Sequence, residues 1–165
     1  MMAPAPTLTV EMADYGEARD AGEVVRLLDA YACDPMGGGE ALNDDVRAKL
    51  VSGLAATPGA FSVIARLDGE AVGLANCMTT FSTFAARPIV NIHDMVVLDG
   101  HRGHGIGRAM FGAIETEAKS RDACKVTLEV LSGNEPAKGL YASLGYGDYQ
   151  LDPAAGSALF WQKAL

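Results

Sequence analysis

The pattern of apolar and polar residues predicts a strand and then a helix at the start of the chain. Leu8–Met12 alternates apolar and polar positions, as a half-buried strand does. Between Gly16 and Ala32 the apolar residues recur at helical spacing and form one stripe. This stripe comprises Val24, Val25, Leu27, Leu28 and Tyr31. The glycine- and proline-rich segment 33–39 then breaks the helix and predicts a loop.

A second helix is predicted after this loop. Asn43 or Asp44 can cap it, because either side chain can accept a hydrogen bond from an unpaired amide of the first turn. The apolar residues of this helix repeat every four positions. They are Val46, Leu50 and Leu54. The tripeptide at 57–59 contains proline and glycine and ends the helix.

The middle of the chain predicts three consecutive strands. Phe61–Leu67 and Glu70–Thr80 are rich in strand-forming residues, and the Asp68-Gly69 pair between them is typical of a tight hairpin turn. A loop over 81–87 then leads into a third strand, Ile89–Leu98. These strands should therefore lie next to one another in an antiparallel sheet.

The last third of the chain predicts further helices and strands. A helix follows the glycine-rich stretch 103–107 and runs to about Ser120, and Lys125–Leu131 alternates as a strand does. Ala137–Leu144 has helical spacing, and Gly145 is its predicted C-cap.

A closing hairpin is expected at the C-terminus. Its two strands are predicted at Tyr146–Leu151 and Ala158–Ala164, on either side of Asp152-Pro153. Phe160 and Trp161 are expected in the core of the last strand.

Length and composition indicate one globular domain. With 165 residues, of which 49% are hydrophobic and 21% charged, the chain can bury a sizeable core. We expect a disordered tail over residues 1–7 and a single domain over 8–165. The net charge of −8 argues against a nucleic-acid-binding surface and is compatible with a cationic substrate such as an amine.

The sequence predicts a cytoplasmic location. It contains no apolar run near the ~20 residues that span a bilayer, so no membrane association is expected. Its start has no basic segment followed by an apolar one, as a signal peptide would. Cys33, Cys77 and Cys124 are an odd number, without disulfide or metal-ligand spacing, and are expected as small buried or half-buried hydrophobes in a reducing compartment.

The glycine-rich stretch offers a binding site for phosphate. The first amides of a helix lack intrahelical partners, and glycines at 103, 105 and 107 let a ligand approach the backbone. Arg102 and Arg108 flank them with positive charge. A P-loop would need Lys after its last glycine, where this chain has Arg108, and the Rossmann pattern G-x-G-x-x-G/A also fails.

The pattern that fits is R-x-x-G-x-G, at Arg102, Gly105 and Gly107. It resembles the coenzyme A loop of the GNAT superfamily of N-acetyltransferases. A second stretch is similar to the other half of the coenzyme site in that family, N-x-x-A-x-x-L-Y-x-x-x-G-[FY]. The matching positions are Asn134, Ala137, Leu140, Tyr141, Gly145 and Tyr146. Gly139 departs from good helix-forming sequence, at a local cost of ~1 kcal/mol relative to Ala.

This resemblance implies a fold, a co-substrate and a site. The implied fold is α/β (α+β), with a central mixed, mostly antiparallel sheet of about seven strands flanked by helices, in the order β-α-α-β-β-β-α-β-α-β-β. The implied co-substrate is acetyl-CoA, and no metal is expected. The residues assigned to the coenzyme are Met95, Val96, Val97, Arg102, Gly103, His104, Gly105, Ile106, Gly107, Arg108, Asn134, Lys138 and Tyr141.

The implied reaction is direct attack of an amine on the thioester of acetyl-CoA. An amine with a pKa of about 10.4 is almost wholly protonated at pH 7, so a base or a water relay must remove its proton. Asp94 and His93 are candidate bases, and adjacent strand residues should face opposite sides. Glu129 or a water relay could serve in their place. Tyr141 stands at the general-acid position of the family.

Several questions stay open from the sequence. A coenzyme A-binding sensor that has lost its chemistry is the alternative to an enzyme, and a longer acyl chain could replace acetyl. The acceptor is a small-molecule or peptide amine, and the resemblance places its site at 31–45 and 79–87, where no signature identifies it. Members of the family commonly pair, so a homodimer is an expectation on which this sequence carries no signal.

Overall fold

The computed structural model describes residues 5–149 and 151–165. The packing of the chain divides it into two compact units, one that ends at Leu131 and one formed by Ser132–Leu165. Residues 1–4 of the predicted disordered tail lie outside the described residues, whereas Thr7 already exchanges two hydrogen bonds with Asp68. No helix in the described ranges is both long and apolar enough to cross a membrane.

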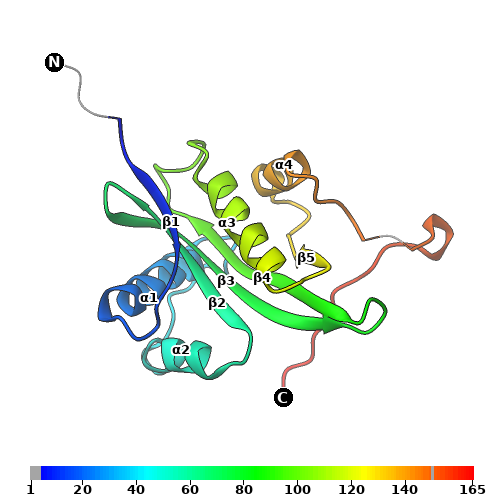
Figure 1. Ribbon diagram of the computed structural model, residues 1–165, viewed down its shortest axis with the longest axis horizontal. Coiled ribbons are helices and arrows are strands. Elements are labelled where there is room, and N and C mark those ends of the chain that lie inside the picture. The colour runs from blue at the N-terminus through cyan, green and yellow to red at the C-terminus, as the bar shows by residue number, and fades with distance from the viewer. Residues whose placement is uncertain (1–4, 150) are drawn as a thin grey trace. The chain divides into compact units, whose positions relative to one another are not determined.

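The first unit is built on a five-stranded sheet in the order β1-β2-β3-β4-β5 (Figure 1). The strands are β1 (Leu8–Met12), β2 (Ala60–Leu67), β3 (Glu70–Ser82), β4 (Arg87–Val97) and β5 (Lys125–Leu128). The first four strands pair antiparallel, and β5 lies parallel to β4. The five strands predicted between Leu8 and Leu131 are thus confirmed, although β5 ends at Leu128 and not at Leu131. The expectation of about seven strands is wrong for the described residues, which form a sheet of five.

Helices cover both faces of this sheet. On one face lie α1 (Ala18–Cys33) and α2 (Asp44–Ala56), which bury Val24, Leu27 and Leu54 against the sheet. On the other face lies α3 (Ile106–Ser120), seen in front of the strands in Figure 1. Its buried residues include Met110, Phe111 and Ile114. Val24 and Leu27 of the stripe predicted for the first helix therefore lie in the core on one face, and α3 forms the core on the other. Val46 of the stripe predicted for the second helix is exposed.

The pleat of β3 separates these two halves. Leu74 belongs to the core under α1 and α2, together with Ile64 and Val96. The adjacent Gly73 faces α3, because a Cβ atom built on it would lie 2.8 Å from Sδ of Met110. Successive strand residues point to opposite faces, so even-numbered residues of this part of β3 face α1 and α2.

The edge of β4 is paired with β5 along only part of its length. Ile89–Ile92 pairs with Lys125–Leu128, and no described strand pairs with the β5-side edge from His93 to Val97. On its other edge β4 follows β3 with one irregularity, since Ile92 is opposite Cys77 and Asp94 is opposite Asn76. His93 has no residue opposite it, so this is a bulge, which interrupts the alternation of side chains there.

The second unit contains α4 (Glu135–Ser143), which begins two residues earlier than predicted. Asn134 caps the start of α4, and its Oδ1 accepts from the Ala137 amide at 3.3 Å. At the other end Gly145 has φ +91°, and the amides of Gly145 and Tyr146 donate to the carbonyls of Ala142 and Tyr141. The predicted glycine C-cap is therefore present, in a Schellman arrangement.

The closing hairpin that we predicted at 146–151 and 158–164 is wrong for the described residues. They form no strand there; Pro153–Ala155 is a single 3₁₀ turn (η1) that the Asp152 side chain caps. Residue 150 lies outside the described residues. Phe160 and Trp161 are 81% and 83% exposed, not in a core. Local turn chemistry at Asp152-Pro153 was predicted correctly, but a strand also needs a partner edge, and apolar sequence alone does not provide one.

Two of the three cysteines are in the expected surroundings. Cys77 is buried and Cys124 is half-buried, whereas Cys33 is exposed at the end of α1. Burial raises the pKa of the Cys77 thiol to about 12, so this thiol stays protonated at neutral pH.

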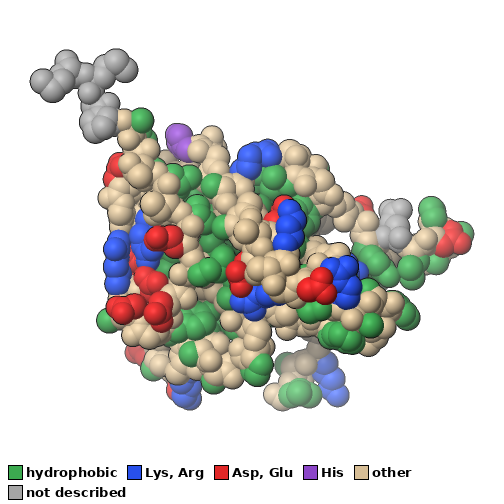
Figure 2. All heavy atoms as spheres, viewed as in Figure 1, with side chains coloured by type: hydrophobic (Ala, Val, Ile, Leu, Met, Phe, Trp, Pro, Cys, Tyr) green, Lys and Arg blue, Asp and Glu red, His purple; other side chains and the backbone are tan. Residues whose placement is uncertain are grey.

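A buried arginine connects β1, β2 and α1. Arg66 of β2 is 6% exposed and bonds Glu11 at 3.0 Å, Asp20 at 2.6 Å and Glu23. Charged side chains of both signs gather on the surface over β1 and α1 (Figure 2). Three carboxylates around one guanidinium offset the cost of burying its charge. This cluster thereby ties the first strand and helix to the sheet.

The close packing between β3 and α3 gives a test of the fold. In Gly73→Ala the new methyl group would meet Met110 and would also lie 3.3 Å from both Ala65 Cβ and Val96 O. We expect destabilisation by about 1–3 kcal/mol, as for other overpacked cores. Urea unfolding followed by circular dichroism measures it. Gly112→Ala on α3, where a Cβ meets nothing within 4 Å, is the control and should stabilise by about 0.5–1 kcal/mol. Equal effects of the two variants would contradict this packing.

Candidate active site

The glycine-rich loop connects β4 to α3 and is open to solvent. Gly100, Gly103 and Gly105 have backbone φ values of +83°, +80° and +80°, which residues other than glycine rarely adopt. A Cβ on Gly103 or Gly105 would meet no atom within 4 Å, so backbone conformation and not internal packing requires glycine there. Gly105 is the N-cap residue of α3, and no side chain caps this helix. Its first amides are thus suited to an anionic ligand.

The residues that follow Gly105 in the sequence form the first turn of α3. Ile106 is buried and anchors the turn, while Gly107 lies within the helix and Arg108 is exposed. His104 is exposed just before the turn, and its Nδ1 lies 3.3 Å from the His101 carbonyl oxygen. The structure therefore brings all of the predicted loop residues to one helix N-terminus.

Arg102 is held by the protein itself. Its Nε donates to the Val97 carbonyl at 2.8 Å, and its guanidinium pairs with Asp34 and Asp99, each at 2.9 Å. Asp34 follows the last residue of α1 and also accepts from the Met36 amide. This amide, and then Arg102, hold the pKa of the Asp34 carboxyl below its usual value. Arg102 therefore braces the glycine loop against the segment that leaves α1.

The unpaired edge of β4 presents backbone amides beside this loop. Leu98 donates its amide to Val72 on β3, and the Val97 carbonyl points the other way, to Arg102. Backbone groups of successive residues in an antiparallel pair alternate between the two edges. By this alternation Met95 and Val97 direct their amides to the unpaired edge, whereas Val96 directs its amide to β3. Two of the three predicted backbone positions thus direct their amides away from β3, and a coenzyme contact by them stays a prediction.

Asp94 lies on the sheet face covered by α1 and α2. It is half-buried and accepts a hydrogen bond from Asn76 at 3.0 Å. Asn76 in turn accepts from Ser62 at 2.6 Å, and Ser62 bonds the hydroxyl of Tyr15 at 2.7 Å. Sequence reasoning did not identify this series of hydrogen bonds, although Asn76 is the one amide side chain in the apolar stretch 71–77.

The other two candidate bases are more exposed than Asp94. His93 is exposed at the bulge. Glu129 is exposed just beyond β5, and Asn91 lies 3.3 Å from its nearer oxygen. The expectation that His93 and Asp94 face opposite sides rested on regular alternation, which the bulge interrupts.

Tyr31 adds a phenol near Asp94. It lies in the last turn of α1 and is half-buried. Burial raises the pKa of Tyr31, and the negative charges of Asp94 and Asp34 raise it further. Three polar groups from α1, its following segment and β4 therefore share one negatively charged environment, which sequence spacing alone did not reveal.

The remaining predicted site residues lie in the second unit. Asn134 is occupied as the N-cap of α4. Lys138 donates to the Ser132 carbonyl at 3.0 Å and pairs with Glu135 at 2.8 Å. Tyr141 is half-buried on α4, one helical turn after Ala137. Coenzyme contacts by these three residues stay a prediction.

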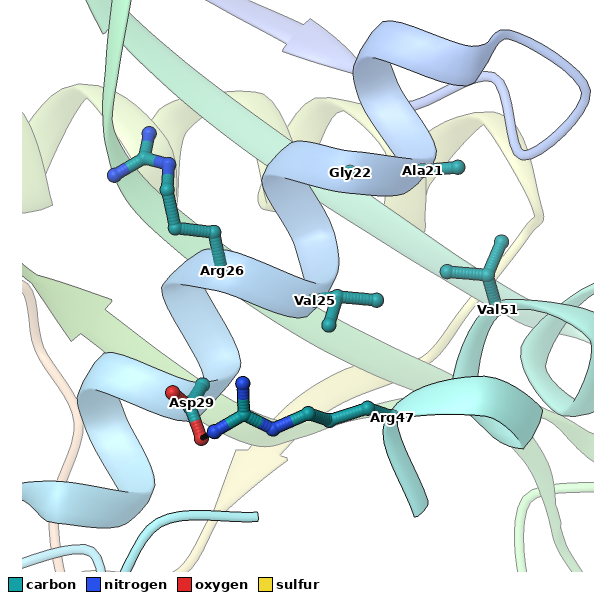
Figure 3. A pocket seen from close by; sticks show the side chains of 7 residues that line it. All are labelled: Ala21, Gly22, Val25, Arg26, Asp29, Arg47 and Val51. Carbon is teal, nitrogen blue, oxygen red and sulfur yellow. Dashed lines mark hydrogen bonds and ion pairs between the residues drawn. The ribbon is translucent and has the colours of Figure 1, made fainter. Parts of the chain in front are cut away.

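A hollow of about 500 Å³ lies between α1 and α2 (Figure 3). Its lining is Ala21, Gly22, Val25, Arg26, Asp29, Arg47 and Val51. Arg47 reaches across it to Asp29 at 2.9 Å, and Arg26 donates to the Ala71 carbonyl at 2.7 Å. None of the predicted site residues lines this hollow. Within the described ranges no cluster of three or more His, Cys, Asp or Glu side chains could hold a metal ion.

Comparison with known proteins identifies the family. Residues 24–146 match the sequence profile of the acetyltransferase (GNAT) family, which is well over half of the chain. The chain therefore belongs to the GNAT family. The match includes β4, the glycine loop and α4, and the resemblance seen in the sequence is confirmed.

Curated relatives align over about half of this chain. An uncharacterised N-acetyltransferase of Archaeoglobus fulgidus is 37% identical over 82 residues, which cover 49% of this chain and 56% of the relative. Streptothricin acetyltransferase of Streptomyces lavendulae is 36% identical over 87 residues, 53% of this chain and 44% of the relative. The chain thus spans about half the length of the curated relatives it matches.

Solved structures share the fold over nearly the whole chain. An aminoglycoside N-acetyltransferase in complex with CoA has a TM-score of 0.76 and 14% identity, and all of both chains is covered. A ribosomal-protein-alanine N-acetyltransferase from Brucella melitensis biovar Abortus 2308 has a TM-score of 0.66 and 21% identity, over 96% of this chain and 98% of that one. At such identities the likeness shows the fold alone.

The brace between Arg102 and Asp34 is testable by a double-mutant cycle. Arg102→Leu, Asp34→Asn and the double variant should show a favourable coupling of about 0.2–1 kcal/mol, as expected for a partly exposed pair. Urea unfolding measures it. Asp45→Asn is the control. It removes an ion pair with Lys49 on α2 that is more exposed than the pair between Arg102 and Asp34, and it should have the smaller effect on stability. Strict additivity of the two single variants would contradict the brace.

The same pair predicts a pH dependence. The pKa of Asp34 is lowered in the folded state, so its contribution is present above the unfolded pKa of about 3.9 and is lost as pH falls through the folded value. The stability difference between wild type and Asp34→Asn should therefore be full at pH 7 and 5 and shrink below pH 4. A difference that does not change with pH would contradict the assignment.

Proposed function

We propose that this protein transfers the acetyl group of acetyl-CoA to a primary amine by direct attack. The observation that carries the proposal is the juxtaposition, in a GNAT chain, of an uncapped helix N-terminus with the unpaired edge of β4. In this proposal a carboxylate or a water relay acts as base, and Tyr141 acts as general acid.

The coenzyme site would combine two kinds of donor. The loop Gly103–Arg108 would hold phosphate with the first amides of α3 and the charge of Arg108. Met95 and Val97 would hold the extended arm through their outward amides, and one of them would donate to the thioester oxygen as negative charge develops there. Acetyl-CoA supplies the activated carbonyl carbon. The fit is supported by the start of α3, which no side chain caps, and by the part of the β4 edge that no described strand pairs with.

We favour Asp94 as the base over the exposed candidates. It faces the α1 and α2 side of the sheet, opposite α3, so it would meet an acceptor that enters from that side. Asp94 and Asp34 both act on Tyr31, and because Arg102 offsets the charge of Asp34, the carboxylate of Asp94 is the group that suits a cationic amine. His93 and Glu129 are exposed and have no comparable buried support among the described contacts.

Tyr141 is proposed as the group that protonates the departing thiolate. The proposal rests on its position in the second motif, which lies inside the family match. A thiolate with a parent pKa near 8.5 leaves more readily when it is protonated, and a phenol can donate that proton.

The acceptor is proposed only as a primary amine of a small molecule or peptide. The names of similar proteins mention streptothricin, aminoglycosides and ribosomal-protein alanine. What these share is an amine, and we carry over no more than that.

Tyr141→Phe tests the acid. We expect kcat to fall by about 10²-fold, in the range of a lost general acid, while the Kd for acetyl-CoA changes little. Thiol release measures kcat and calorimetry measures Kd. Tyr149→Phe, an exposed tyrosine beyond the motif, is the control and should behave as wild type. Equal loss of turnover and affinity would exclude the assigned role.

Thermal unfolding with acetyl-CoA, followed by thiol release against a panel of amines, tests the function itself. Ligand at 100 times its Kd should add about 2.7 kcal/mol, a shift of several degrees for a chain of this size. Stabilisation with thiol release supports the enzyme. Stabilisation without release for any amine favours a sensor, and no stabilisation would contradict the coenzyme site.

A further inference from the structure

A line of polar side chains runs through the otherwise apolar interior under α1 and α2. Ser62 and Asn76 are each 1% exposed, and their neighbours Ile64 and Leu74 are fully buried core residues. Buried polar groups cost free energy unless they are paired, and these are paired with one another. The line starts at half-buried Tyr15 and ends at Asp94.

The carboxylate at the Asp94 end sets the direction of every hydrogen bond in this line. Asp94 as a carboxylate can only accept, so Asn76 presents its Nδ2 donor to Asp94 and its Oδ1 acceptor to Ser62. Ser62 has one proton, which it donates to Asn76, so Tyr15 must donate to Ser62. Burial raises the pKa of Tyr15, so this phenol keeps the proton that it donates. All three donors therefore point toward Asp94.

We propose that Asn76 is a positioning residue, which orients the Asp94 carboxylate for proton transfer from the acceptor amine and is itself oriented by Ser62 and Tyr15. This inference rests on the proposed function. The step is a single proton transfer, in which an N–H bond of the ammonium group breaks and an O–H bond forms on Asp94. The amine lone pair that is released can then attack the thioester.

The line orients Asp94 and does not conduct protons. A proton that moved from Asp94 toward Tyr15 would have to be accepted by Nδ2 of Asn76, and an amide nitrogen has no acceptor capacity. The proton must therefore leave Asp94 on its exposed side. A fixed carboxylate matters because proton transfer requires a short, aligned approach, and an error of about 1 Å can cost 10²-fold in rate.

Asn76 is the neighbour that orients the Asp94 carboxylate. Tyr31 from α1 and Cys77 from β3 interact with Asp94, and burial raises the pKa of each, so both are neutral at pH 7. Asp34, which also acts on Tyr31, is paired with Arg102. Among the hydrogen bonds of the described residues, the one from Asn76 ties Asp94 to the core.

Asn76→Asp tests the proposal with almost no change of shape. The variant replaces the amide donor by a second carboxyl group beside Asp94 and can still accept from Ser62. Two carboxyl groups this close hold one proton between them, so Asp94 is no longer a carboxylate that is free to take the proton of the amine. With acetyl-CoA and the amine that gives the fastest thiol release with wild type, we expect kcat to fall about tenfold or more, with the Kd for acetyl-CoA unchanged. In an Asp94→Asn background the same substitution should cause little further loss, because the oriented group is already absent.

Two further variants separate positioning from general damage. Tyr15→Phe removes only the far end of the line and should lower kcat less than Asn76→Asp does. Asn91→Asp makes the same chemical change on β4 beside Thr127 and Glu129. A large loss with Asn91→Asp and none with Asn76→Asp would overturn the proposal in favour of Glu129. Fully additive losses of kcat for Asn76→Asp and Asp94→Asn would overturn it as well.

Melting temperatures do not depend on catalysis, so they test the contact between Asn76 and Asp94 separately from the proposed function. The drops in melting temperature of Asn76→Asp and Asp94→Asn should be less than additive in the double variant, because the amide introduced at position 94 can donate to the carboxylate introduced at position 76 and so restores the hydrogen bond in reverse. If thiol release fails for wild type while this coupling is present, the proposed function fails and Asn76 remains the partner that orients Asp94. Additive drops in melting temperature would overturn the contact itself.

Discussion

The constraint on which the site depends is the short pairing between β4 and β5. Only Ile89–Ile92 of β4 has β5 beside it, so the backbone beyond the bulge at His93 keeps one edge without a strand partner in the described sheet. Backbone amides normally must be paired when they leave water, which makes such an edge next to a helix N-terminus a natural place for a ligand. The Arg102 guanidinium and the glycine conformations hold the adjoining loop in place.

The interior of the sheet has a second, less visible constraint. Polar side chains at Ser62 and Asn76 interrupt an apolar core, and each is tolerated because it bonds the next residue toward Asp94. A fully satisfied buried network resists rearrangement, since the loss of any member leaves others without partners. The hydrogen bonds that pair these buried polar groups thus end at the half-buried carboxylate of Asp94. Stability and the proposed chemistry share these residues.

Much of the fold could be predicted from local patterns. The alternation in Leu8–Met12, the Asp68-Gly69 turn and the stripe that includes Val24 and Leu27 each predicted an element that the structure contains. Helix ends at Asn43 and Gly145 followed from capping chemistry. The C-terminal hairpin was wrong because strand pairing depends on a distant edge, which periodicity does not encode.

The sequence by itself determined the family, through the glycine pattern at Arg102–Gly107 and the motif from Asn134 to Tyr146. These signals are local because helix N-termini and glycine conformations depend on adjacent residues. Only the tertiary structure decided that Arg102 binds Asp34, that His93 forms a bulge and that Asn76 bonds Asp94. The two side-chain contacts join residues that are 18 and 68 positions apart in the sequence. Strand register and packing, not sequence spacing, bring these residues together.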